Sequence, residues 1–226
     1  MEIKKSIFVM AFLITIILLL SIILIGSVLN KGRKNFIDEQ MQSVNDISDM
    51  QVYLLMSDTY GDKIACLSLK SKLKDWDKSL WDLGNKLEQY RIASEEFSKD
   101  EYYLEQKKQF NEKQQLYLIF LTKIKSDCNL NKTIITFFFQ NSKDCNKCDD
   151  QSYILTDIKR KAGDDVAIFS FDADLNITNI NLLMEYYGVN EFPCIIINEK
   201  KYCGIQDRNF IVEKICKDTP VPELCN

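Results

Sequence analysis

Two cysteines, Cys145 and Cys148, directly follow an unbroken run of β-branched and aromatic residues over 133–139. Such a run predicts a strand that is buried on both faces, as in the middle of a parallel sheet. A Cys-x-x-Cys motif after this strand, at the start of a helix, places a dithiol where helix N–H groups stabilise a thiolate. The spacing also lets the second sulfur close on the first. The sequence therefore predicts a strand, the cysteine pair and a helix in direct succession along the chain.

A second signal lies further along, where Phe192 and Pro193 lead into another short apolar strand. Between and after these signals, strand-like runs alternate with short amphipathic ones. The sequence predicts strands at 133–140, 166–171, 194–198 and 201–204, and helices at 148–162, 179–187 and 207–217. A parallel strand pair joined by a helix crosses over right-handedly, and the last two strands are close enough for a hairpin. Together they predict a mixed sheet.

The N-terminal stretch over 6–30 has no charged residue and is rich in Ile, Leu, Val and Phe. As a helix it spans roughly 36 Å, enough to cross a bilayer. A cleaved signal peptide is the alternative, but no Ala-x-Ala-like cleavage site follows the stretch. We therefore expect an uncleaved transmembrane anchor. Basic residues flank it on both sides, so the positive-inside rule gives no orientation.

The other six cysteines give the orientation. They lie at 66, 128, 194, 203, 216 and 225. An even and large number of cysteines favours an oxidising compartment. We therefore expect a single-pass protein of the cell membrane with a cytoplasmic N-terminus and residues 31–226 outside the cytosol.

The cysteine pairing is only partly suggested by position. A bridge between Cys66 and Cys128 would tie the helical segment to the next domain, and two buried free thiols are the alternative. Cys216 and Cys225 would staple the C-terminal tail. The four cysteines after residue 193 allow three pairings among themselves.

Composition excludes several function classes. The chain has no histidine, which removes Ser-His-Asp and Cys-His catalysis and histidine metal sites. A zinc site at Cys145 and Cys148 would need Cys194 and Cys203 as its other ligands, which is not the spacing of a compact knuckle. We expect no metal and no cofactor. The net charge of −4 does not indicate nucleic-acid binding, which needs an excess of positive charge.

Residues 34–126 lack proline and carry apolar residues at helical spacing, which predicts three long helices with breaks near 58–61 and 97–100. Ser98 is the expected cap of the last one. The expected inner positions are Ile37, Met41, Val44, Ile47, Leu54, Leu55, Leu67, Leu69, Leu73, Trp76, Leu80, Leu83, Leu87, Leu104, Phe110, Tyr117, Phe120, Leu121 and Ile124. These side chains, with Trp81, are expected to serve as core packing.

Residues 129–226 resemble a thioredoxin-fold domain in its minimal form. The strand, Cys-x-x-Cys and helix over 133–162 carry the resemblance, together with the proline-led strand and the closing strand and helix. The resemblance implies a three-layer α/β domain with a mixed four-stranded sheet. With its anchor over 6–30 and helical segment over 34–126, the whole chain also resembles membrane-anchored thioredoxin-like proteins of prokaryotes, chiefly archaea.

The chain departs from the family pattern around the motif. Asp144 stands where a tryptophan is usual before the first cysteine, and Asn-Lys separates the two cysteines. Phe139 occupies the position six residues before Cys145, where an acidic residue would act as a buried proton acceptor. These departures speak against a dedicated reductase of the cytosolic type.

The resemblance implies thiol–disulfide exchange on extracytosolic protein cysteines, with an unidentified electron donor or acceptor. Cys145 would be the attacking thiolate and Cys148 the resolving thiol. The Phe192–Pro193 bond would be cis, with the proline against the sulfurs and the preceding backbone shown to the substrate. The competing hypothesis is a non-catalytic binding or scaffold module that keeps the fold and uses the disulfides structurally.

Overall fold

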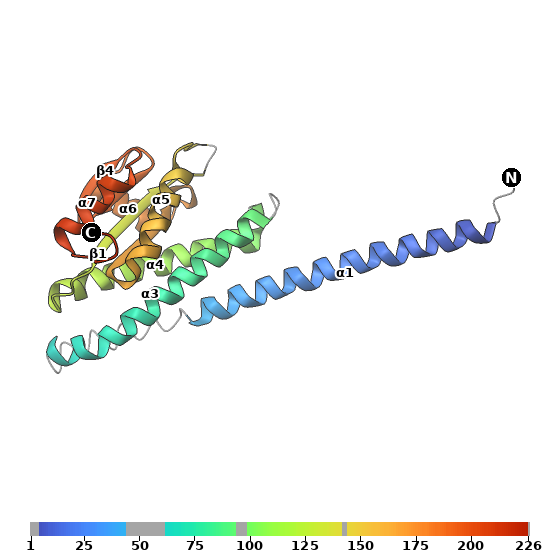
Figure 1. Ribbon diagram of the computed structural model, residues 1–226, viewed down its shortest axis with the longest axis horizontal. Coiled ribbons are helices and arrows are strands. Elements are labelled where there is room, and N and C mark those ends of the chain that lie inside the picture. Colours follow the sequence, from blue (N-terminus) through green and yellow to red (C-terminus); the bar gives the residue numbers. More distant parts are fainter. Residues whose placement is uncertain (1–4, 44–61, 94–98, 142–143, 226) are drawn as a thin grey trace.

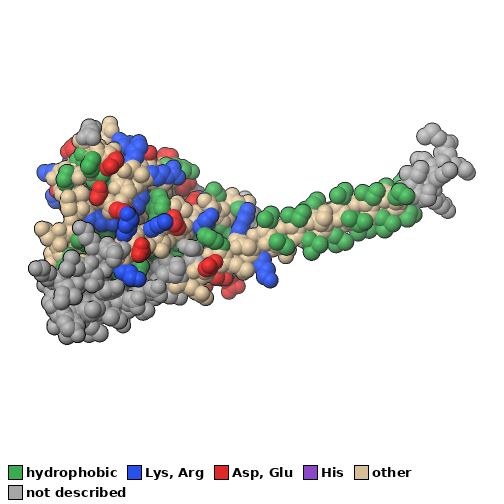
Figure 2. Space-filling view, turned by 60° about the horizontal axis from the view of Figure 1, so that its bottom comes forward, with side chains coloured by type: hydrophobic (Ala, Val, Ile, Leu, Met, Phe, Trp, Pro, Cys, Tyr) green, Lys and Arg blue, Asp and Glu red, His purple; other side chains and the backbone are tan. Residues whose placement is uncertain are grey.

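A long N-terminal helix projects from a compact body in the computed structural model, which describes residues 5–43, 62–93, 99–141 and 144–225 (Figure 1). This helix, α1 (Lys5–Ser43), covers the expected anchor and continues unbroken into the expected helical segment. Among the described residues, one helical stretch, Phe8–Glu39, is long and apolar enough to cross a membrane. Figure 2 shows hydrophobic side chains along its projecting part and the first lysine and arginine side chains where it meets the body.

Two further helices form an antiparallel hairpin beside the C-terminal domain. They are α3 (Asp62–Ala93) and α4 (Glu101–Asp127). The expected break at 58–61 and the expected cap Ser98 lie outside the described residues. Asp100 caps α4 instead, because its side chain accepts a hydrogen bond from the Tyr102 backbone N–H at 3.3 Å. Aspartate serves as well as serine in this role.

Most of the expected inner positions of the hairpin are buried. Trp76 packs edge-on against Tyr117 and Phe120, and Leu83 and Leu121 are fully enclosed. Leu104 is an exception, with 44 % of its surface exposed, and Phe110 is only partly buried. Val44, Ile47, Leu54 and Leu55 lie outside the described residues, as do the side chains of Leu67 and Leu69.

The C-terminal domain contains a four-stranded sheet in the order β2-β1-β3-β4. The strands are β1 (Thr133–Phe139), β2 (Val166–Asp172), β3 (Cys194–Ile197) and β4 (Lys200–Cys203). The first two are parallel, and the other pairs are antiparallel. The helices α5 (Cys148–Ala162), α6 (Thr178–Tyr187) and α7 (Arg208–Asp218) complete it. The expected thioredoxin-like α/β architecture with a mixed four-stranded sheet is confirmed.

Alternation along the strands builds two apolar cores, one on each face of the sheet. Ile135, Phe137 and Ile195 face α5 and α7. Phe138 and Phe171, one residue out of phase, face the helices α4 and α6. The expected three layers are therefore present, and α3 stacks on α4 as an additional helix.

The helical hairpin protects the β2 edge of the sheet. The Gln114 side chain on α4 accepts a hydrogen bond from the Ser170 N–H and donates one to the Ser170 carbonyl, both at 3.0 Å. Asn111 accepts from the Asp172 N–H at 3.1 Å. These side chains satisfy backbone groups of β2 that would otherwise offer a template for a foreign strand.

We call the end of the body where β1 begins the distal end; it contains Cys66, Cys128, Asp77, Lys132 and Lys159. The sulfurs of Cys66 and Cys128 are bonded, which ties α3 to the chain just before β1. Asp77 Oδ2 lies 2.6 Å from Lys159 Nζ and 3.4 Å from Lys132 Nζ, with all three side chains about nine-tenths buried. Burial lowers the pKa of Lys132 below its ordinary value.

Candidate redox site

The Cys-x-x-Cys pair lies at the carboxyl edge of the parallel strands. The Cys145 and Cys148 sulfurs are bonded at 1.98 Å, with their Cα atoms 5.5 Å apart. Both residues are buried, with 5 % of Cys145 and 2 % of Cys148 exposed. The loop is held by the Cys145 N–H, which donates to the Asn141 carbonyl at 3.0 Å.

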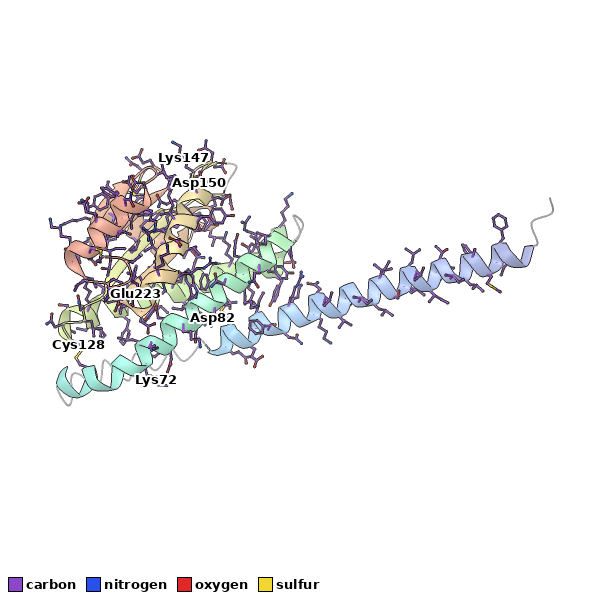
Figure 3. The ribbon with its side chains drawn as sticks, in the orientation of Figure 1. Lys72, Asp82, Cys128, Lys147, Asp150 and Glu223 are labelled. Carbon is purple, nitrogen blue, oxygen red and sulfur yellow. A yellow bond between two sulfur atoms is a disulfide. The ribbon has the colours of Figure 1, made fainter. Side chains whose placement is uncertain are left out.

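Cys148 is the first residue of α5, so the disulfide sits at a helix N-terminus as expected. Lys147 occupies the N-cap position, and its side chain makes no capping hydrogen bond. The Cys148 N–H donates to the Cys145 carbonyl at 3.3 Å, and the helix dipole favours a thiolate at this end of α5. Asp149 and Asp150 lie in the same turn and place negative charge there. Figure 3 shows Asp150 beside Lys147.

The Phe192–Pro193 peptide bond is cis. Pro193 is buried, and its carbonyl accepts a hydrogen bond from the Gly204 N–H at 2.8 Å. Phe138 of β1 pairs with Cys194 of β3, so Pro193 lies one residue further, opposite the end of β1. The proline thus lies at the same edge of the sheet as the cysteine loop. We call this region, with Cys145, Cys148, Pro193, Phe139 and Asp172, the redox edge.

The four remaining cysteines form two local bridges. Cys194 and Cys203 face each other in the β3–β4 register and are bonded, with their Cα atoms 3.9 Å apart. Cys216 in α7 is bonded to Cys225 in the tail. All eight cysteines of the chain are therefore paired. Cys194 and Cys203, which a zinc site at Cys145 and Cys148 would need as ligands, are bonded to each other. The described residues contain no group of three or more side chains that could hold a metal ion.

An ion pair that the sequence did not suggest lies beside the redox edge. Lys107 of α4 pairs with Asp172, the last residue of β2, which is 1 % exposed. Lys107 Nζ also lies 5.7 Å from the centre of the Phe139 ring. In the parallel register Phe139 pairs with Asp172. The domain therefore has a buried carboxylate at this edge after all, on the neighbouring strand and neutralised by a lysine from the helical hairpin.

A cavity of about 500 Å³ separates the helical hairpin from α5. Trp81 and Phe110 contribute apolar surface, Arg91 and Lys107 contribute cations, and Cys148 lies in its wall. Its size and mixed lining are those of a ligand or peptide site. Trp81, expected to be core, thus lines this cavity instead.

Gln151, one turn after Cys148, is fully buried. Its Oε1 accepts from the Gln206 N–H at 2.7 Å, which joins α5 to the loop between β4 and α7. Its Nε2 has no acceptor among the described residues. Sequence reasoning missed Gln151, Lys107 and Asp172, because their roles depend on contacts between elements far apart in the chain.

No family model and no curated protein sequence matches the chain. Solved structures do match part of it. Thioredoxin-2 of the malaria parasite, a component of its protein secretion machinery, is 23 % identical, with 38 % of this chain and 84 % of that chain covered and a TM-score of 0.34. The exposed lipoprotein thioredoxin Etrx1 of Streptococcus pneumoniae is 18 % identical over 38 % of this chain and 85 % of that chain, with a TM-score of 0.33.

The germline-specific thioredoxin Deadhead of Drosophila melanogaster is 16 % identical over 44 % of this chain and 92 % of that chain, with a TM-score of 0.33. The fold itself is established by the order of elements and the geometry above. A parallel β1–β2 pair, a Cys-x-x-Cys at the start of α5, a cis proline before β3 and an antiparallel β3–β4 pair all occur in one domain. Residues 129–225 therefore have a thioredoxin-like fold.

Proposed function

We propose that the protein is a membrane-anchored thiol–disulfide oxidoreductase that acts on protein cysteines outside the cytosol. The observation that carries the proposal is the Cys145–Cys148 disulfide at the uncapped N-terminus of α5, at the same sheet edge as the cis Pro193. A helix N-terminus stabilises the thiolate that attacks, and the second cysteine resolves the intermediate. Within this proposal the chain is one of the membrane-anchored thioredoxin-like proteins of prokaryotes.

In the reducing direction, the Cys145 thiolate attacks one sulfur of a client disulfide and forms a mixed disulfide, releasing one client thiolate. The Cys148 thiolate then attacks the Cys145 sulfur, which releases the second client thiolate and forms the Cys145–Cys148 bond. Two electrons pass to the client, and two protons from solvent complete its thiols. The oxidising direction is the reverse, and an external donor or acceptor of two electrons closes each cycle.

The location is part of the proposal. Four disulfides in one chain favour an oxidising compartment for residues 31–226. The apolar stretch of α1 serves as the anchor, so with residues 31–226 outside the cytosol the N-terminus lies in the cytoplasm. A membrane-impermeant maleimide applied to intact, mildly reduced cells should label the thiols. Labelling only after lysis would reverse the orientation.

A second candidate function is a non-catalytic binding module, and one observation favours it. Cys145 is 5 % exposed, so an attacking client sulfur has little access to it in the oxidised form. In this alternative the Cys145–Cys148 bond is structural, and the helical hairpin and its cavity make the partner contacts.

Mutation of the two cysteines separates the candidates. The reduced full-length protein in detergent micelles should exchange with a scrambled disulfide substrate, and Cys145→Ser should abolish the exchange. Cys148→Ser should accumulate mixed disulfides that are visible on non-reducing gels. Equal exchange by the wild type and Cys145→Ser would remove the catalytic function and leave the binding module.

A further inference from the structure

The anchor helix is docked onto the tip of the helical hairpin. Lys34 Nζ lies 3.3 Å from Asp100 Oδ2, and the Tyr102 hydroxyl lies 2.9 Å from the Lys34 carbonyl and 2.8 Å from Asp38 Oδ1. Ile37 and Met41 of the same helix are buried. These contacts begin only four residues after Asn30, the end of the uncharged stretch. The hairpin tip is therefore held close to the end of the membrane-spanning part.

A cavity shared by α1 and α3 places the hairpin tip at the same level. Val28 and Leu29, among the last apolar residues of the span, line a cavity together with Lys86 and Gln89 of α3. The C-terminal end of α3 thus reaches the level where the apolar stretch of α1 ends. If α1 spans a bilayer, this end of the body lies at the headgroup region.

A continuous series of contacts leads from this docked tip to the redox edge. The Tyr90 hydroxyl donates to Asp100 at 2.8 Å, and the Tyr90 ring stacks on Tyr103 with centroids 6.1 Å apart. Lys107 Nζ lies 5.8 Å from the Tyr103 ring and 5.7 Å from the ring of Phe139 at the end of β1. The redox edge is therefore at the end of the body that faces the anchor.

The distal end lies on the other side of the body. Asp77, in the first half of α3, pairs with Lys159 near the end of α5, and Cys66 near the start of α3 is bonded to Cys128. Figure 3 shows Lys147 and Asp150 at one end of the body and Cys128 at the other. Figure 1 shows that α1 leaves the body on the side of the hairpin tip, along the direction in which α3 and α4 extend.

The height of the redox edge above the bilayer follows from the helix rise. Lys34 lies about 6 Å beyond Asn30, and Lys107 lies about 10 Å further along α4 than Asp100. The redox edge is thus about 15–20 Å from the end of the apolar stretch. A folded domain of about 100 residues has a radius of gyration near 13 Å and is too thick for this gap. An extended chain covers the distance with about five or six residues.

We propose that the redox edge faces the membrane at a fixed height and exchanges with cysteines in extended juxtamembrane segments of membrane-anchored proteins, about five to ten residues from the bilayer. The inference rests on the proposed function, because it assigns that site its substrate class. The cavity between the hairpin and α5 lies along the approach, since its wall includes both Arg91 near the hairpin tip and Cys148. In each exchange the client disulfide gains the two electrons that the Cys145–Cys148 dithiol loses.

The test uses the full chain in liposomes, reduced beforehand, with client peptides that carry one cysteine as a mixed disulfide with glutathione. In the near client this cysteine lies six residues after a transmembrane segment. In the far client a rigid helical spacer of 25 residues, about 37 Å long, holds it away from the surface. Release of glutathione reports attack on the client. We expect the near client to react at least tenfold faster than the far one.

A matched variant moves the site without touching it. Seven residues of helical sequence inserted after Asn30 add about two turns and lift the body by about 10 Å. The preferred client cysteine should then lie further from its anchor, and the near client should slow several-fold. A soluble peptide with the same mixed disulfide should react equally with the wild type and the insertion variant.

The outcomes separate the two proposals. Equal rates for near and far clients, with the soluble peptide still reacting, overturn the membrane-facing arrangement and leave the oxidoreductase intact. An unchanged near-client rate after the insertion overturns it in the same way. If no client, soluble or anchored, releases glutathione, both the oxidoreductase function and the substrate class are wrong.

Discussion

The two ends of the body are built by opposite means. At the distal end, a disulfide links residues 62 positions apart, and a buried aspartate lies between two lysines. At the redox edge, the disulfide links residues only three positions apart. The hairpin is held there by the Lys107–Asp172 ion pair, the contact of Lys107 with the Phe139 ring and the hydrogen bond from the Asp172 N–H to Asn111, beside a cavity. A bridge that closes a long loop stabilises the fold more than one that closes a short loop. We infer from this difference that the distal end contributes mainly to the stability of the fold, whereas the redox edge carries the thiol–disulfide chemistry.

The largest expected effect tests the buried charges of the distal end. Asp77→Asn leaves Lys159 and Lys132 without their carboxylate, each with about a tenth of its side chain exposed. Removing one partner of a buried ion pair typically costs about 3–5 kcal/mol of unfolding free energy. Urea unfolding of the protein in detergent micelles measures the loss. Lys74→Ala, at the exposed pair with Asp164, is the control and should change stability by less than about 0.5 kcal/mol. Equal losses in the two variants would contradict the burial argument.

The next prediction compares the two disulfides directly. Replacing both Cys66 and Cys128 by serine should lower the unfolding free energy by about 4 kcal/mol, because the loop they close is long. The same change at Cys145 and Cys148 should cost about 1–2 kcal/mol, because their loop is short. Denaturant midpoints of the two double variants provide the measurement. Equal losses of unfolding free energy in the two double variants would contradict the assignment of stability to the distal bridge.

A smaller effect concerns the charges in the first turn of α5. Asp149 and Asp150 oppose a thiolate at Cys145, because they place negative charge at the same helix N-terminus. Changing both to asparagine should stabilise the reduced form by about 0.5–2 kcal/mol in total, which makes the pair more oxidising by about 10–40 mV. Equilibration with glutathione gives the potential. Asp164→Asn with Asp165→Asn, far from the motif in sequence and beyond the end of α5, is the control and should leave the potential unchanged.

The smallest effect concerns the pH dependence of the hydrogen bond between Tyr90 and Asp100, at the hairpin tip where Asp100 also contacts the anchor helix. The hydrogen bond from Tyr90 holds the pKa of Asp100 below its ordinary value of 3.8. A lowered folded-state pKa means that the ionised form stabilises the fold above about pH 4, and that this contribution is lost as the pH falls through the folded-state value. Tyr90→Phe should therefore cost about 1 kcal/mol at pH 7 and less at pH 3. Equal costs at the two pH values would show that Asp100 is not the partner that matters.

The sequence predicted the domain that contains the cysteine pair well, because its signals are local. Strand and helix boundaries lie within one or two residues of the expected ones, and the cis bond lies at Phe192–Pro193. Strong β-branched runs, the Cys-x-x-Cys spacing and the proline each act within a few residues of their position. The cap of α4 at Asp100 was missed, because Ser98 and Asp100 both precede that helix and either residue type is a good cap.

The relation between the hairpin and the domain was not predictable in the same way. Gln114 covers the β2 edge, and Lys107 pairs with Asp172 across 65 positions of sequence. No local sequence pattern distinguishes these residues, because a polar residue on a helix is predicted to face solvent unless the partner surface is known. The absence of an acid at Phe139 suggested that the site had no buried carboxylate, whereas Asp172 supplies one from the neighbouring strand.

The central claim is that Cys145–Cys148 is the exchangeable disulfide and the other three are structural. Equilibration of the folded protein over a range of redox buffers, followed by alkylation and mass spectrometry of each cysteine, tests it most directly. We predict that Cys145 and Cys148 become alkylated in buffers less reducing than about −300 mV, while the other six cysteines stay protected there. The claim is contradicted if Cys145 and Cys148 stay oxidised below about −300 mV, or if the Cys66–Cys128 bridge opens before they do.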